Sequence, residues 1–151
     1  MGRESTVIDP YARQQEIIAR FMAVLPAHLT PYVFTGSVPD GKAIPLYPDG
    51  KVRPHFVISF AGITEPNAKV NGITGAQDDS FMQGFQTHGI AADDDAARRV
   101  NSLGLGAMLG FSPTGCGQIR PAFFAGVGEI SSLSSPTRYS AVQAFRFLMN
   151  P

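Results

Sequence analysis

The stretch FMQGFQTHGIAADDDAARRVNSLGLGAMLG, residues 81–110, decides the fold, because it changes from a strand pattern to a helix pattern. Up to Ile90 it mixes apolar and polar side chains, as a half-exposed strand does. Aspartates then stand where the positive end of a helix dipole favours negative charge. Apolar residues follow at helical spacing: Ala96, Val100, Leu103 and Ala107. We predict a strand over 81–90 and a helix from about Asp93 to Leu109.

Two features of this stretch invite other interpretations. Asp93, Asp94 and Asp95 could bind a divalent cation, but consecutive helix positions point about 100° apart and do not converge on one ion. The cluster GLGAMLG at 104–110 lacks the GxGxxG spacing, and it lies at the wrong end of the helix for phosphate. We therefore expect helix capping by the aspartates, and close packing and a C-cap from the glycines.

A second helix pattern lies near the N-terminus. Asp9 can cap it, and Pro10 stands where a missing N–H costs nothing. Pro26 ends the pattern, so we predict an amphipathic helix over residues 10–25. Its apolar stripe is formed by Ile17, Ile18, Phe21, Met22 and Leu25.

The segments between the helices are extended and broken by turns. Two PDGK tetrapeptides, at 39–42 and 48–51, favour chain reversals, because Pro presets φ and Gly accepts a positive φ. They predict two hairpin turns of an antiparallel meander. The alternating segment HFVISFA, residues 55–61, predicts a strand at or near the centre of the sheet.

Two strands are predicted after the second helix. Residues 119–127 contain Pro121, which favours a sheet edge. Residues 137–149 alternate throughout and predict a long, mostly paired final strand. The fold class is thus α+β, with a largely antiparallel sheet, two main helices on one face and long loops. We expect one domain over 1–151, with an irregular loop at about 62–79.

Composition excludes several classes of protein. The 151 residues carry 12 Lys+Arg and 12 Asp+Glu, so zero net charge disfavours electrostatic binding of nucleic acid. A single cysteine leaves no disulfide framework, and neither a signal peptide nor an apolar run long enough for a membrane span is found. Hydrophobic residues make up 44% and charged residues 16%, which suggests that other subunits cover part of the surface.

Catalysis is not indicated. Cys116 lies in the turn SPTGCGQ, but His28, His55 and His88 are distant in sequence and match no nucleophile signature. The histidines also lack metal-ligand spacing. We expect no enzyme activity, no metal and no cofactor.

The order of the predicted segments along the chain is similar to that of a known protein family. An amphipathic helix ending at VLPAHL leads through PYVFTG to RPHFVISFAG, followed by a loop with GITGAQDDS. The strand and aspartate-capped helix of FMQGFQTHGIAADDDAARRVNSLGLGAMLGF come next, and PTRYSAVQAFRFLMN closes the chain. This order resembles the tail terminator (tail-completion) proteins of long-tailed, non-contractile bacteriophages, particularly those of actinobacteria, over nearly the whole chain.

The resemblance implies a structural virion protein with one tail-terminator-like domain. Such a protein is assembled in the host cytoplasm and forms a homohexameric ring on the head-proximal end of the tail tube. It stops tube polymerisation and joins the tail to the head-completion or stopper protein at the head–tail junction, the neck. Its partners would be its own copies, the tube protein and the head-side protein, with no membrane. Genomic DNA would pass through the lumen without specific binding.

On this basis two sets of residues are candidate contact sites. The loop residues Val70, Asn71, Gly72, Ile73, Thr74 and Gly75 are expected to face the tube or the lumen. Arg98 and Arg99 are expected to contact a neighbouring subunit. Alternatives remain open: another neck subunit, such as a head–tail connector or stopper, a small ligand-binding module, or a small enzyme that uses Cys116.

Overall fold

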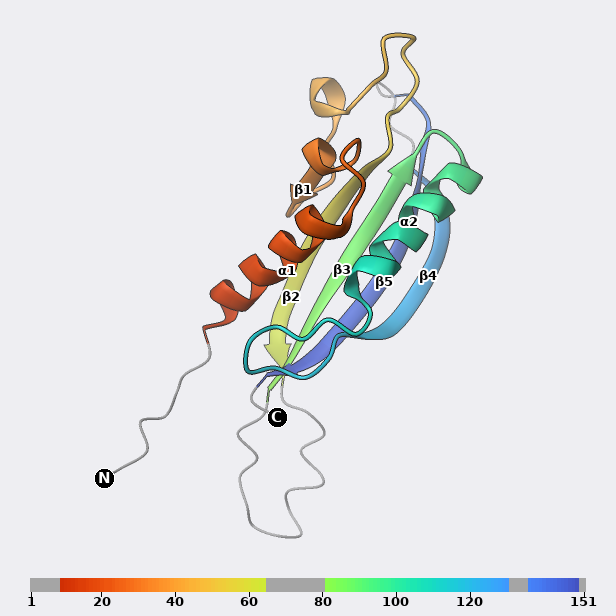
Figure 1. The fold of residues 1–151 in the computed structure, drawn as a ribbon. Helices are drawn as coiled ribbons and strands as arrows, with labels where there is room; N and C mark the ends of the chain where they lie inside the picture. The colour runs from red at the N-terminus through yellow and green to blue at the C-terminus, as the bar shows by residue number, and fades with distance from the viewer. Residues whose placement is uncertain (1–8, 65–80, 131–135, 150–151) are drawn as a thin grey trace, which may run out of the picture.

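The structure is a computed structural model that describes residues 9–64, 81–130 and 136–149 (Figure 1). Its helices and strands follow in the order α1 (Pro10–Val24), β1 (Val33–Thr35), β2 (His55–Thr64), β3 (Phe81–Ala91), α2 (Asp94–Met108), β4 (Arg120–Ile130) and β5 (Arg138–Met149). Short 3₁₀ helices at Thr30–Tyr32 and Gly41–Ala43 flank β1. The final strand and the strand over 81–90 are confirmed.

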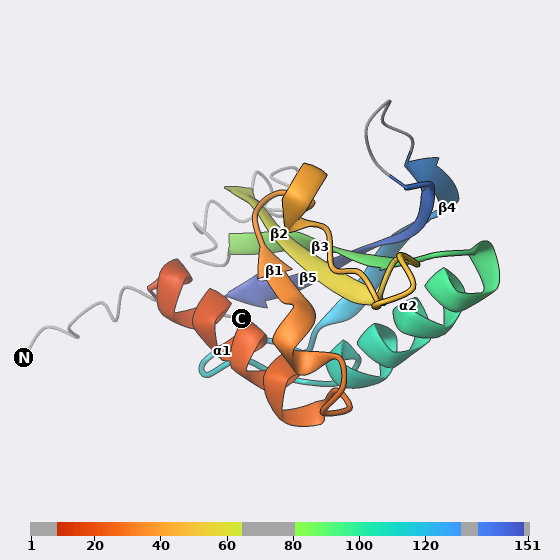
Figure 2. The same ribbon diagram turned by 90° about the horizontal axis from the view of Figure 1, so that it is seen from above.

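The strands form one sheet in the order β1-β2-β3-β5-β4, and every pair except β1–β2 is antiparallel. Both α1 and α2 lie on the same side of this sheet, and neither reaches the other side (Figures 1 and 2). The α+β prediction, with two helices on one face of a largely antiparallel sheet, is confirmed.

The predicted meander before β2 is wrong. β1 pairs with β2 in parallel, with Val33 opposite Phe56. Residues 36–54 therefore carry the chain back to the end of the sheet where β1 began, and their prolines prevent regular ladder pairing. The first PDGK leads into the 3₁₀ helix at Gly41–Ala43. The second makes a turn closed by an isolated bridge between Leu46 and Val52.

The α1 helix begins as predicted. The Asp9 side chain accepts a hydrogen bond from the Tyr11 N–H at 3.0 Å, and Pro10 occupies the first turn. The helix ends one residue before the predicted boundary, with Leu25 as its C-cap. Ile17 and Phe21 are buried, but Met22 of the predicted stripe is 45% exposed.

The aspartates before α2 act as caps. Asp93 accepts a hydrogen bond from the Ala96 N–H at 2.7 Å, and Asp94 and Asp95 occupy the first turn. At the other end, Gly110 follows the C-cap residue with a φ of 82°, a conformation that glycine favours. Both capping predictions are confirmed.

Close packing of α2 on the sheet depends on glycines. A Cβ on Gly104 would lie 2.9 Å from the Phe56 ring, whereas one on Gly106 would meet nothing within 4 Å. The prediction of tight packing holds for Gly104 and is wrong for Gly106. The close approach between two backbones occurs instead at Gly89 of β3, where a Cβ would lie 2.9 Å from the Asn101 nitrogen.

The main core lies between the helices and the sheet. Phe85 of β3 and Phe145 of β5 stack with ring centroids 5.0 Å apart. Around them lie buried apolar side chains from both helices and from the sheet: Ile17, Phe21, Leu25, Phe56, Ile58, Val100, Ala107, Met108, Phe147 and Met149. The alternation predicted for β2 places Phe56 and Ile58 in this core.

At two irregularities of the sheet, the side chain of a buried glutamine donates a hydrogen bond to a backbone carbonyl oxygen. The β2–β3 register shifts between Phe60 and Ile63, and Gln83 Nε2 donates to the Ala61 carbonyl oxygen at 2.6 Å. The β4–β5 register shifts between Pro121 and Phe123, and Gln143 Nε2 donates to the Phe123 oxygen at 3.0 Å. β4 lies at the sheet edge, as Pro121 predicted.

β2 continues to Thr64, so the first residues of the loop predicted at about 62–79 belong to a strand; the rest of that loop lies outside the described residues. In the described residues, no helix has the length and apolar character that a membrane crossing requires.

Candidate functional site

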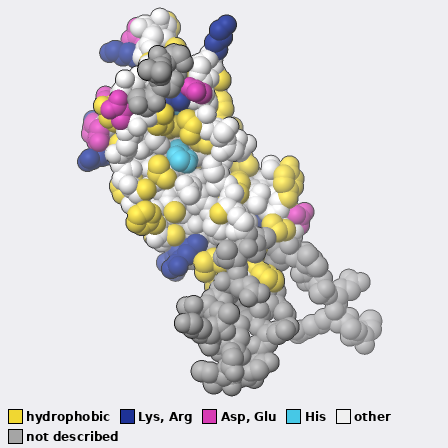
Figure 3. Space-filling view, turned by 180° about the vertical axis from the view of Figure 1, so that it is seen from behind, with side chains coloured by type: hydrophobic (Ala, Val, Ile, Leu, Met, Phe, Trp, Pro, Cys, Tyr) yellow, Lys and Arg dark blue, Asp and Glu magenta, His cyan; other side chains and the backbone are white. Residues whose placement is uncertain are grey.

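Neither α1 nor α2 covers the side of the sheet that faces away from the main core (Figures 1 and 2). Alternation along β3 and β5 directs one set of side chains into the core and the other set to this side. We call the neutral part of it the open face, formed by Gln86, His88, Phe123, Val142 and Ala144; the exposed Arg120 and Arg146 adjoin it on the same side of the sheet. These side chains are neutral or apolar, and Phe123 is 67% exposed. Figure 3 shows this side from behind the sheet, with charged side chains towards its ends.

At one end, the connection between β1 and β2 closes this side of the sheet. Asp40 of that connection lies 3.7 Å from Arg138, which is only 2% exposed. The Arg53 carbonyl accepts a hydrogen bond from His55 Nδ1 at 2.7 Å. Burial lowers the pKa of Arg138, and the Asp40 carboxylate acts in the opposite direction. The end of the sheet at which β2 and β5 begin is therefore part of the folded interior.

The histidines of this side are held neutral. Burial lowers the pKa of His55 below its ordinary value of 6.5, against the effect of its hydrogen bond to Arg53. Burial also lowers the pKa of His88. At neutral pH neither histidine adds positive charge to the open face.

At the other end, two arginines stand directly opposite each other. Arg120 of β4 and Arg146 of β5 are partners in the strand register, so both side chains lie on the same side of the sheet. Both are exposed. We call them the arginine pair.

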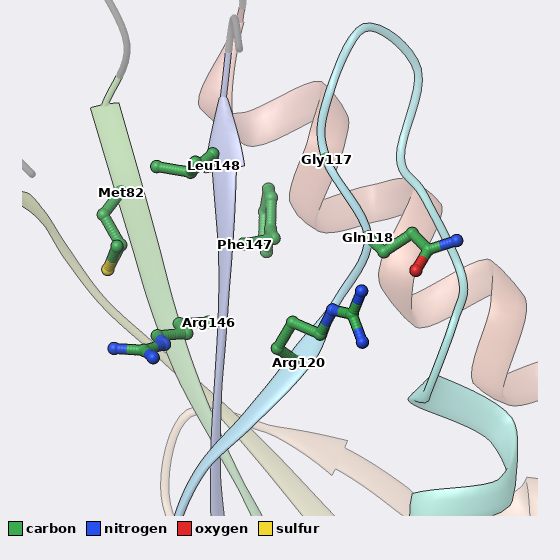
Figure 4. Close-up of a pocket in the computed structure, with 7 residues that line it drawn as sticks. All are labelled: Met82, Gly117, Gln118, Arg120, Arg146, Phe147 and Leu148. Carbon is green, nitrogen blue, oxygen red and sulfur yellow. The ribbon is translucent and has the colours of Figure 1, made fainter.

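The arginine pair lines a cleft of about 480 Å³. Met82 and Leu148 contribute apolar surface, and Gln118 contributes a side-chain amide. The two guanidinium groups reach to opposite sides of β5, that of Arg120 towards Gln118 and that of Arg146 towards Met82 (Figure 4). An anionic segment lying across the strand could contact both.

The arginine pair differs from the other arginines that the structure describes. Those others form ion pairs or lie over aromatic rings: Arg13 with Glu16, Arg98 with Asp94, Arg99 with Asp95, Arg138 with Asp40, Arg20 over Phe111, and Arg53 over Tyr32 and Tyr47. Over residues 9–64, 81–130 and 136–149, no carboxylate lies within ion-pair distance of Arg120 or Arg146.

The contact residues predicted from sequence have different positions. Arg98 and Arg99 lie on the exposed side of α2, where they pair with Asp94 at 2.7 Å and Asp95 at 3.0 Å. They remain accessible to a neighbour, but each already has a carboxylate partner. The loop Val70–Gly75 lies outside the described residues.

The structure separates Cys116 from two of the histidines. The Cys116 backbone forms an isolated β-bridge with Met149, at the end of β5. His88 lies opposite Val142, which is seven residues earlier on β5. At the rise of a strand these two positions are about 23 Å apart. His55 pairs with Ile90, which lies opposite Ser140 and is therefore farther still. No group of three His, Cys, Asp or Glu side chains suited to a metal occurs in the described part of the chain.

Sequence reasoning missed the arginine pair. The alternation of the last strand places Arg146 on the side away from the core, which is the signal that was present. Its pairing with Arg120 could not be derived, because two register shifts in β4 change which residues face each other.

Comparison with known proteins finds no matching family model and no matching curated protein.

Proposed function

We propose that the protein is a structural subunit of bacteriophage tails, one that closes into a six-membered ring on the head-proximal end of the tail tube. In this role it terminates tube growth and joins the tail to head-completion proteins. The sequence resemblance to tail terminator proteins supplies the biological context. The open face is the observation that carries the assembly role, because uncharged, partly apolar surfaces are those that subunits bury against each other.

A ring of identical subunits joined head to tail needs two different complementary patches on each copy. The open face supplies one. The outer side of α1 supplies apolar groups for the other, since Tyr11 is 67% exposed and Met22 is 45% exposed. The two residues lie about three helical turns apart and therefore on the same side of α1. These surfaces are on opposite layers of the molecule, as head-to-tail contact requires.

Mass photometry of the protein, alone and with tail tube protein, tests the proposal. The expected particle has six times the 16.1 kDa chain mass, or the tube end gains a matching ring visible by electron microscopy. A protein that stays monomeric and leaves the tube ends unchanged would contradict the assembly role.

A further inference from the structure

The proposed ring contacts do not use the cleft lined by Arg120 and Arg146. We propose that it is a docking site for a carboxylate-bearing segment of a partner protein. The assignment stands on the cleft alone and does not depend on ring formation.

Charge is the first argument. Like charges directly opposite each other on neighbouring strands destabilise a sheet. In this pair the repulsion has no compensating carboxylate among the described residues, although the other described arginines have an ion pair or an aromatic ring. An incoming carboxylate relieves the repulsion, and the guanidinium fork matches its two oxygens.

The walls of the cleft indicate a polypeptide. Met82 and Leu148 offer apolar surface to the aliphatic part of an acidic side chain. The Gln118 amide lies beside the Arg120 guanidinium and can pair with a peptide group (Figure 4). The guanidinium groups on either side of β5 suit a segment with more than one carboxylate.

The surroundings argue against nucleic acid. Single-stranded nucleic acid binds along grooves with several cations and stacking aromatic side chains. Beyond the arginine pair, the open face continues with Gln86 and with His88, whose pKa burial lowers, so neither adds positive charge at neutral pH. Two cations with apolar walls fit a short acidic segment better than a phosphate backbone.

Fluorescence anisotropy with a labelled hexaglutamate peptide at low salt tests the site, with hexaglutamine as the neutral comparison. Wild type is expected to bind hexaglutamate and not hexaglutamine. The R120Q/R146Q variant is expected to weaken hexaglutamate binding at least about tenfold, since both charge-assisted contacts are lost. The matched control is K42Q/K51Q, which removes the same charge from two exposed lysines of the β1–β2 connection and should change affinity by no more than about twofold.

Three results would overturn the proposal: no hexaglutamate binding by wild type, equal weakening in both double variants, or tighter binding of a labelled oligothymidylate that R120Q/R146Q abolishes. The last would make the cleft a nucleic-acid phosphate site. Thermal unfolding confirms that each variant is folded, and the single variants R120Q and R146Q, each expected to show part of the loss, replace the double variant if it is not.

Discussion

Gly89 of β3 lies directly against the backbone of Asn101 of α2, so close that a Cβ on the glycine would stand 2.9 Å from the Asn101 nitrogen. Backbone cannot move aside as a flexible side chain can. This contact sets how near α2 approaches the sheet. It therefore fixes the spacing between the helix layer and β3.

Gly89→Ala is expected to lower the free energy of unfolding by about 1–3 kcal/mol, because the added methyl group forces α2 away from β3. Urea denaturation measures the change. Gly84→Ala on the same strand is the control, since its Cβ would meet its neighbours at an ordinary 3.7 Å. Equal effects of the two substitutions would show that the Gly89 contact does not limit packing.

Gln143→Met keeps the side-chain volume close to that of glutamine but removes the donor that bonds the Phe123 carbonyl at the β4 bulge. We expect a loss of about 1–2 kcal/mol in the free energy of unfolding, because the buried Gln143 amide no longer donates to the Phe123 and Ala144 carbonyl oxygens. Gln86→Met on the open face should change it by no more than about 0.5 kcal/mol. A neutral result at Gln143 would mean that water or a local shift replaces the bond.

Stability should fall with acidification, and His55 should contribute to the fall. Burial lowers the pKa of His55 in the folded protein, so below its ordinary pKa of 6.5 the unfolded chain binds more protons. His55 therefore stabilises the fold fully above pH 6.5, and this contribution is lost as the pH falls from there towards the folded pKa, at up to about 1.4 kcal/mol per pH unit.

Urea denaturation of wild type and His55→Gln, at about pH 7.5 and about pH 5.5, measures this contribution. The variant should lose less stability between the two conditions than wild type. The stability of the variant should still depend on pH, because burial also lowers the pKa of His88. Identical pH dependence in the two proteins would rule out the assigned contribution of His55.

Ala144→Glu places a charge in the middle of the open face, opposite Phe123 on β4. If assembly buries this face, the variant should remain a folded monomer whose association is weakened at least about tenfold, because the added carboxylate must be desolvated on association. Ser102→Glu, on the exposed side of α2, should assemble as wild type does. Mass photometry and thermal unfolding give the two readouts. Undiminished assembly of Ala144→Glu would exclude the open face as the contact.

Local chemistry in the sequence predicts much of this fold. The alternation of residues 137–149 gives β5, Pro121 gives the sheet edge, and Asp93 gives the start of α2. Each of these signals lies within a few residues of the feature that it predicts. The parallel pairing of β1 is different, because it depends on the path of residues 36–54 across the end of the sheet.

The candidate site was less accessible to prediction for the same reason. Arg120 and Arg146 face each other only through the register of β4 with β5, and that register changes at two bulges. Long-range register and close approaches such as Gly89 with Asn101 arise from three-dimensional packing. Neither leaves a periodic pattern in the chain.

The central claim is that copies of this chain cap the tail tube, and electron microscopy of particles assembled without the protein tests it most directly. The account predicts tubes of uncontrolled length with no heads attached, and restoration of normal particles when the wild-type protein is supplied. Tails of normal length joined to heads in the absence of the protein would contradict it.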